Sequence, residues 1–195
     1  MTTTSPSETP YEHVMLDIET MSLHPHKALI LSIGMIEFDP APLKQLFVGK
    51  RSLLVLDIPA QLALGRRVDV STQEFWAKQP YEASRHWVDA DEHHSPHEAI
   101  GLVQKFCEGR TRVWANGTQF DLSNIIGLAE DIGIGKDSLW HYRAPRDMRT
   151  FVRETPAMRL VPIGDALDIP GVAHEPVYDC TVQAWQVWAH WQNPS

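Results

Sequence analysis

The sequence has few cysteines, no long apolar run and fewer basic than acidic residues, and these shortages exclude several classes of protein. Two cysteines, Cys107 and Cys180, cannot build a disulfide framework in a chain of 195 residues. The longest apolar stretch, residues 28–38, is interrupted by Ser32, Gly34 and Glu37, so it falls short of the roughly 18 residues of a membrane span. We therefore expect a cytoplasmic protein with no membrane partner.

We also expect no signal peptide in this sequence, and no internal repeats or low-complexity tracts are seen in it. Its opening, MTTTSPSETPYEH, has no basic start and no apolar stretch, which is unlike a signal peptide. Hydrophobic residues make up 43% and charged residues 22%, which is typical of a globular domain that folds alone. We expect a polar tail at residues 1–12 and a single domain at residues 13–195.

The net charge of -8 argues against a protein that binds nucleic acid through a broad basic face. However, acidic residues can also be metal ligands. Two bound divalent cations would bring the net charge to about -4 and concentrate positive charge at one place. The acidic balance therefore does not exclude a polyanionic substrate.

Three strand patterns open the domain. Segments rich in Ile and Leu are separated by turn signals such as Asp39-Pro40. We expect strands at residues 13–17, 29–39 and 45–55, paired as an antiparallel meander. Helix signals follow, beginning with two capping boxes, Ser71 with Glu74 and Ser95 with Glu98.

The second capping box predicts a helix that runs to about Gly109 and buries Ile100, Val103, Phe106 and Cys107. A short strand is expected at residues 112–115, then helices at 122–131, from near 147, and at 176–191. In the last helix, we expect packing by Val182, Trp185, Trp188 and Trp191. This order predicts an α/β domain, with a mixed sheet flanked by helices.

Four acidic residues and one histidine are the candidate functional residues. Asp17 and Glu19 end an apolar strand, and their spacing of two places both on one face. Asp121 stands at a predicted helix start, and Asp179 lies inside the last helix, five residues after His174. Taken singly, Asp121 also fits a carboxylate stabilised by the helix dipole, and His174 also fits an ordinary loop residue.

Together, these residue types suit two-metal hydrolysis of a phosphodiester. Mg²⁺ and Mn²⁺ prefer oxygen ligands, and two such ions about 4 Å apart can hold the attacking and leaving oxygens. Neutral His174 could accept the proton of the attacking water near neutral pH. Zinc is not expected, because the remaining histidine clusters lack cysteine partners: His24 with His26, and His93 with His94 and His97.

These residues carry a resemblance to a known family. Asp17-Ile18-Glu19-Thr20, Asn116 to Phe120-Asp121, and His174 to Asp179 resemble, in order, the three exonuclease motifs of the DEDDh superfamily. That superfamily includes RNase T, oligoribonuclease and polymerase proofreading exonucleases, and the resemblance spans residues 14–184. Within it, four segments resemble the small stand-alone exoribonuclease-like domains of actinobacteria and phages: 17–21, 74–79, 147–150 and 179–180.

The resemblance implies a ribonuclease-H-like fold and metal-dependent 3′→5′ removal of nucleoside monophosphates from single-stranded ends, with RNA slightly favoured over DNA. Asp17, Glu19, Asp121 and Asp179 would hold two Mg²⁺ or Mn²⁺ ions, and His174 would be the general base. The substrate contacts that it implies are Thr20 at the terminal 3′-hydroxyl, Met21 against the last base, and Asn116 and Phe120 supporting the pocket.

Several roles stay open at this point. Trp76, with Gln79, fits either stacking on a base or packing in the core. Asp147 fits an extra carboxylate of the site or a helix N-cap. An arginine-rich stretch fits either a phosphate-binding strip or a solvated helix face: Arg143, Arg146, Arg149 and Arg153.

The function itself also has open alternatives. They are an exodeoxyribonuclease for DNA processing or proofreading and a catalytically silent nucleic-acid-binding module of the same fold. A homodimer is open as well.

Overall fold

A computed structural model describes residues 11–41, 46–154 and 170–192. Its centre is a five-stranded sheet in the order β3-β2-β1-β4-β5. Strands β1 (His13–Thr20), β2 (Ile30–Asp39) and β3 (Phe47–Val55) form an antiparallel meander. Strands β4 (Arg112–Ala115) and β5 (Pro145–Asp147) add to β1 in parallel. The predicted mixed sheet is confirmed, with β5 as an addition that is too short to show a sequence pattern.

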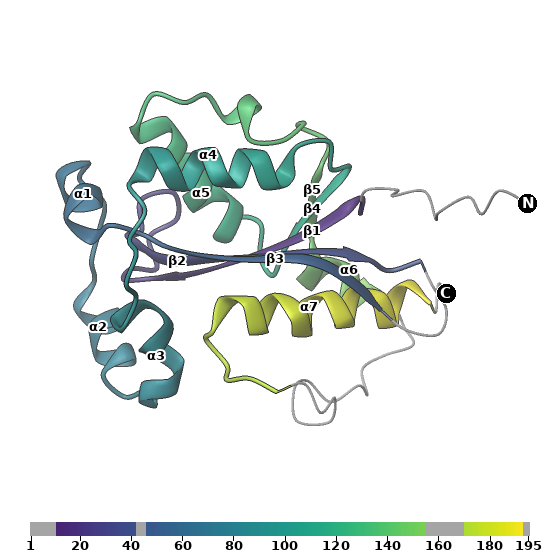
Figure 1. Cartoon of the computed structure of the whole chain (residues 1–195), viewed down its shortest axis with the longest axis horizontal. Coiled ribbons are helices and arrows are strands. Elements are labelled where there is room, and N and C mark those ends of the chain that lie inside the picture. Colours follow the sequence, from purple (N-terminus) through teal and green to yellow (C-terminus); the bar gives the residue numbers. More distant parts are fainter. Residues whose placement is uncertain (1–10, 42–45, 155–169, 193–195) are drawn as a thin grey trace, which may run out of the picture.

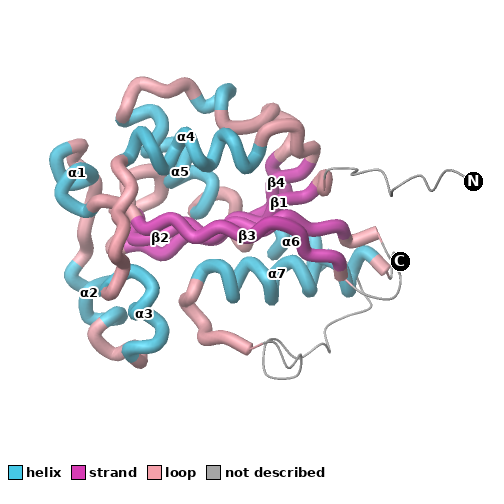
Figure 2. The backbone as a smooth tube through the Cα atoms, viewed as in Figure 1, coloured by secondary structure: helices cyan, strands magenta, loops and turns pink. Residues whose placement is uncertain are grey.

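Helices cover both faces of this sheet (Figure 1). One face carries α4 and α5, the other carries α6 and α7, and three short helices gather at one end of the sheet (Figure 2). In chain order the helices are α1 (Ile58–Ala63), α2 (Val70–Trp76), α3 (Tyr81–Val88), α4 (Pro96–Cys107), α5 (Asp121–Asp131), the 3-10 helix η1 (Lys136–Ser138), α6 (Met148–Glu154) and α7 (Pro176–Trp191).

Side chains of β1 alternate between the two faces of the sheet, which divides the core into two parts and sets the direction of the acidic side chains. Val14, Leu16 and Ile18 pack with α4 and α5 in one cluster. Met15 faces the other way and packs with residues of α7. Because Asp17 shares the parity of Met15, the strand directs its carboxylate toward α7.

The helix starts confirm one predicted capping box and correct the other. At α4, Ser95 Oγ accepts from Glu98 N at 3.3 Å, and Glu98 Oε2 accepts from Ser95 N at 2.9 Å. Helix α2 begins at Val70 and not after Ser71, and Asp69 is its N-cap residue. The Asp69 carboxylate makes no cap bond because it accepts from Ser22 Oγ and Leu23 N instead.

The buried face of α7 also differs from the predicted tryptophan row. Its core residues are Cys180, Ala184 and Val187, with Trp191 packed partly against them. Spacings of four and three follow the helical repeat more closely than a run of threes. Trp185 and Trp188 are therefore half-buried, with ring centroids 6.0 Å apart, and lie outside this core cluster.

Cys107 and Cys180 are both buried free thiols, as expected. Among the described helices, none combines the length and the apolar character of a membrane span.

Candidate active site

The first two carboxylates come from the end of β1. Asp17 is half-buried, and its Oδ1 accepts a hydrogen bond of 2.7 Å from Gln183 Nε2 on α7. Glu19 is 9% exposed. Gln183 has no counterpart among the sequence-predicted residues, although it lies one helical turn after Asp179 and so shares its face. That spacing is the signal that could have identified it.

The third carboxylate belongs to the first residue of α5. Strand β4 ends in a turn at Gly117, whose φ of 117° suits glycine. This turn places the N–H of Asp121 3.2 Å from the Gly117 carbonyl oxygen, and Asp121 is only 6% exposed. The helix-start position is as predicted, but the side chain is directed into a cleft that it shares with Asp17 and Glu19.

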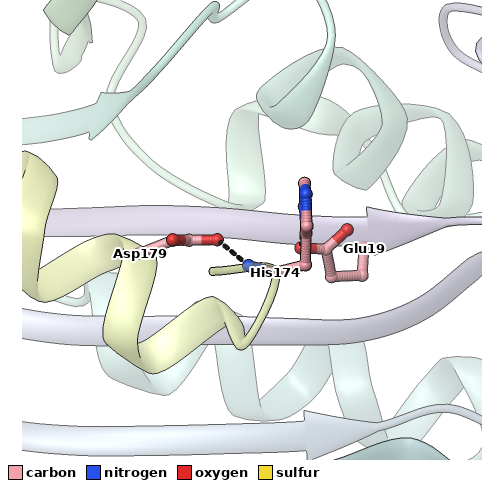
Figure 3. A group of neighbouring side chains, drawn as sticks. All are labelled: Glu19, His174 and Asp179. Atoms are coloured by element: carbon pink, nitrogen blue, oxygen red, sulfur yellow. Dashed lines mark hydrogen bonds and ion pairs between the residues drawn. The ribbon is translucent and has the colours of Figure 1, made fainter. Parts of the chain in front are cut away.

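Asp179 and His174 come from the start of α7. Asp179 Oδ2 accepts from the backbone N–H of His174 at 2.8 Å, which ties the preceding loop to the helix (Figure 3). His174 has a φ of 70°, the left-handed region that non-glycine residues seldom adopt. In this conformation its Nδ1 lies 3.6 Å from Glu19 Oε1. Figure 3 shows the imidazole and the Glu19 carboxylate side by side.

Gly34 allows α7 to come this close to the sheet. A Cβ at position 34 would lie 2.5 Å from the carbonyl carbon of Pro176 and 2.6 Å from its oxygen. Gly34 is paired with Asp17 in the sheet register. The close approach of β2 and α7 therefore sets the distance between the acids of β1 and those of α7.

Burial, and then nearby negative charges, raise the pKa values of all four carboxyl groups. The pKa of Glu19 rises to about 7, mainly through burial, although the nearby His174 imidazole opposes the rise. Burial likewise raises the pKa of Asp121 to about 7 and that of Asp179 to about 6. The pKa of Asp17 is raised well above its usual value by burial and then by the negative charges of Asp121, Glu19 and Asp179.

The pKa of His174 is raised as well, first through its contact with the Glu19 carboxylate, while partial burial opposes the rise. The cluster thus gathers more negative charge than its surroundings neutralise. Such a set of oxygens is suited to bind positive charge.

The donor set fits hard divalent cations. One ligand atom each from Glu19, His174 and Asp179 lies within 4.8 Å of the others. All four carboxylates line one open cleft of about 1050 Å³, with no cysteine in its lining. A set rich in carboxylate oxygens and without sulfur suits a divalent cation.

Asn116, Phe120 and Arg149 also line this cleft. Arg149 donates to the Asn116 carbonyl oxygen at 3.0 Å, so it closes the turn after β4 and offers a positive charge beside the acids. Asp147 lines the cleft too, but its two oxygens accept from Thr150 N and Thr118 N. Burial raises the pKa of Asp147, but these backbone donors outweigh it and hold the pKa below its usual value. This is what the helix-cap alternative predicts.

A smaller pocket of about 380 Å³ adjoins the cleft at Glu19 and His174. Leu23 and Phe75 line it and are 72% and 40% exposed. The Phe75 ring lies 5.2 Å from the His174 ring, edge to face. Neither residue was among those predicted from the sequence, because each belongs to a loop or helix whose position depends on distant contacts.

The sequence-predicted contacts Thr20, Phe120 and Trp76 line this pocket, whereas Met21 does not. Thr20 and Trp76 both line it, but Trp76 is 8% exposed and its Nε1 donates to the Thr20 carbonyl oxygen at 2.9 Å. Trp76 is thus a core residue, as the packing alternative predicted. Met21 packs against the Leu29 and Leu31 cluster instead of the pocket. A register shift between Glu19 and Thr20 ends the alternation that would have brought Met21 to the cleft.

Comparisons with known proteins bear on the family and the fold. Residues 12–191 match a family model described as a 3′-5′ exoribonuclease Rv2179c-like domain. Escherichia coli exonuclease I, solved with a dT13 oligonucleotide, is similar with a TM-score of 0.61 and 13% identity, over 91% of this chain and 40% of that chain. Exonuclease I from Methylocaldum szegediense gives a TM-score of 0.61 and 16% identity, over 90% of this chain and 39% of that chain.

At these identities the structural likeness shows the fold alone, which is the predicted ribonuclease-H-like fold. The chain spans about 40% of the length of the exonuclease I chains that it matches. No curated protein matches its sequence.

Proposed function

The chain belongs to the family of 3′-5′ exoribonuclease Rv2179c-like domains, and we propose that it hydrolyses the last phosphodiester bond at the 3′ end of single-stranded nucleic acid. The observation that carries this proposal is the convergence of four carboxylates and one histidine in one cleft. They come from three segments far apart in the sequence, and together they correspond to the DEDDh set. The products would be nucleoside monophosphates.

Asp17, Glu19, Asp121 and Asp179 would hold two Mg²⁺ or Mn²⁺ ions, which supply positive charge to the scissile phosphate and acidify water. The chain's own groups prepare this site in two ways. Gln183 fixes one oxygen of Asp17, and the backbone N–H of His174 fixes one oxygen of Asp179. Carboxylates held in this manner lose less conformational entropy when a cation binds.

His174 is the proposed general base. Its side chain is 40% exposed, so its ring reaches the cleft, while Nδ1 is held beside Glu19. The raised pKa of His174 strengthens it as a proton acceptor, provided that the ring is neutral when the water attacks the phosphate. The edges of Phe75 and Trp76 restrict the ring's orientation.

The terminal nucleoside would occupy the smaller pocket beside Glu19 and His174. Its walls include the exposed side chains of Leu23 and Phe75, which offer apolar contact to a base. Stacking of a base on an aromatic ring contributes roughly 1 to 3 kcal/mol. RNA is the favoured substrate, and the description of the matched family as exoribonuclease supports this choice.

A second candidate is an exodeoxyribonuclease. The similar fold of Escherichia coli exonuclease I, which was solved with a DNA oligonucleotide, favours it. Discrimination between the two depends on contacts with the 2′-hydroxyl. A silent binding module is disfavoured, because such a module has no need for five reactive side chains that converge in one cleft.

The deciding experiment is digestion of matched 5′-labelled RNA and DNA oligomers, single- and double-stranded, with Mg²⁺ or Mn²⁺. We expect release of mononucleotides from single strands, faster for RNA, and loss of release in Asp17→Asn and Asp179→Asn. Asp91→Asn, which changes an exposed loop residue, is the matched control and should stay active. Turnover by Asp17→Asn at the wild-type rate would refute the proposed site.

The base assignment has its own test. His174→Asn retains a residue type that tolerates positive φ. We expect it to bind Mn²⁺ as wild type does, measured by titration calorimetry, while its hydrolysis rate falls and loses the pH dependence of an imidazole. An unchanged pH–rate profile would exclude His174 as the base.

A further inference from the structure

A second large cavity lies away from the catalytic cleft, where the parallel strands begin. It measures about 990 Å³ and is open to solvent. The C-terminal part of α4, the start of β4 and the loop before β5 form its walls. None of the four cleft carboxylates lines it, and neither does His174.

Positive charge is concentrated around this cavity, in a chain whose net charge is -8. Among the described residues that line it, five are lysine or arginine and three are acids: Lys105, Arg110, Arg112, Arg143 and Arg146 against Glu12, Glu108 and Asp137. Within the described part of the chain, no ion pair involves Lys105, Arg143 or Arg146. Their charges are therefore available to an anionic ligand.

One arginine of this cavity, Arg146 of β5, is held by the backbone. Arg146 Nη1 donates to the carbonyl oxygens of Arg143 at 2.6 Å and Pro145 at 2.8 Å. Carbonyl oxygens fix the guanidinium without neutralising its charge. A fixed and uncompensated guanidinium is well suited to contact a phosphate.

Exposed aromatic rings stand beside these charges. Tyr142 is 69% exposed, and its ring centroid lies 4.5 Å from that of His141. The guanidinium of Arg143 lies over the Tyr142 ring at 5.3 Å. An exposed aromatic next to several cations is the combination that binds single-stranded nucleic acid, because bases stack on the rings while the cations contact phosphates.

One segment links this surface to the catalytic cleft. Arg146 lines the cavity, whereas Asp147 lines the cleft, and Arg149 lines the cleft two residues later. At no more than about 3.6 Å per residue, the five residues from Tyr142 to Asp147 span at most about 18 Å, a distance that a few nucleotides can bridge. A strand with its 3′ end in the cleft can therefore reach Tyr142.

We propose that Tyr142, Arg143 and Lys105 bind the 5′ part of a single-stranded nucleic acid whose 3′ end lies in the catalytic cleft. This inference rests on the proposed exonuclease function. It predicts that longer substrates bind more tightly, since a dinucleotide fills the cleft without reaching Tyr142. Because cations of this surface would contact phosphates, the tighter binding of longer substrates should weaken as the salt concentration rises.

The test compares a dinucleotide with an oligomer of about 12 nucleotides, a length within the range bound by single-strand modules. For Tyr142→Ala and Arg143→Glu we expect KM for the oligomer to rise about fivefold or more, with dinucleotide kinetics unchanged. Arg143→Glu should also reduce the salt dependence of KM. The matched controls, Tyr81→Ala and Arg51→Glu, change exposed residues of the same types on α3 and β3 and should behave as wild type.

A second readout separates this inference from the proposed function. Fluorescence anisotropy of the labelled oligomer is measured in EDTA, where metal-dependent hydrolysis is blocked. Weaker binding by Tyr142→Ala than by Tyr81→Ala supports the surface even if no mononucleotide is ever released. Equal binding by all variants, together with an unchanged KM for the oligomer, overturns it.

Discussion

Gly34→Ala should disable the active site from outside it. The added Cβ would lie 2.5 Å, 2.6 Å and 2.7 Å from the carbonyl carbon, oxygen and Cβ of Pro176. Ordinary contacts begin near 3.4 Å, so α7 and β2 must separate by about 1 Å at this point. Backbone atoms form most of the obstacle, and a side-chain rotation cannot relieve it.

The expected effect follows from what α7 carries. Overpacking of this size typically costs about 1 to 3 kcal/mol, equivalent to a fall of about 2 to 12 °C in Tm for a chain of this length. Displacement of Asp179 and His174 by about 1 Å from the acids of β1 can lower kcat/KM by about 100-fold. Activity should therefore fall further than stability alone explains.

The assay pairs thermal unfolding with initial rates at a temperature where the variant is folded. Gly101→Ala is the matched control, because Gly101 lies on the exposed face of α4 and nothing lies within 4 Å of its Cβ position. Alanine there should raise stability by up to about 1 kcal/mol and leave kcat/KM unchanged. Wild-type Tm and kcat/KM in Gly34→Ala would show that the close approach of β2 and α7 does not position the site.

Two further predictions concern stability and positioning. Burial and then the positive charge of Arg112 lower the pKa of His13 to about 3, so the folded state resists protonation that the unfolded chain accepts below about 6.5. The free energy of unfolding should therefore decrease as the pH is lowered from about 6.5 to about 3, by up to about 1.4 kcal/mol per pH unit from this group. His13→Gln should flatten that slope in urea unfolding at several pH values, and an equal slope in both proteins would contradict the assignment. Gln183→Leu removes the hydrogen-bond donor to Asp17 Oδ1. We expect it to weaken Mn²⁺ binding or to lower kcat/KM by about 10- to 100-fold. An unchanged Mn²⁺ affinity in calorimetry, with an unchanged kcat/KM, would show that Asp17 needs no such support.

Local patterns predicted the elements with strong periodicity or capping. The meander, α4 with its Ser95 capping box and the bounds of α7 all follow from side-chain spacing in neighbouring residues. Elements that lack such a pattern were not predicted. Strand β5 has three residues and forms because β4 offers it an edge, and α1 and α3 are short helices at the end of the sheet.

The site residues likewise fall into those that the sequence predicted and those that it did not. Asp17, Glu19, Asp121, His174 and Asp179 were found from motif spacing, and the structure brings all five to one cleft. Gln183, Leu23 and Phe75 were not found, because each matters through a contact with residues distant in the sequence. Met21 was expected at the last base; it follows the register shift at the end of β1 and packs, partly buried, against the Leu29 and Leu31 cluster.

The sequence by itself determined the chemistry, since the choice of carboxylates and histidine limits the site to hard cations and proton transfer whatever their arrangement. Only the tertiary structure decided how those groups act together. Close contact at Gly34, the positive φ of His174 and the separation of a basic, aromatic cavity from the cleft all depend on packing between distant segments. Such packing is a property of the whole fold, because it arises from contacts that no single stretch of sequence contains.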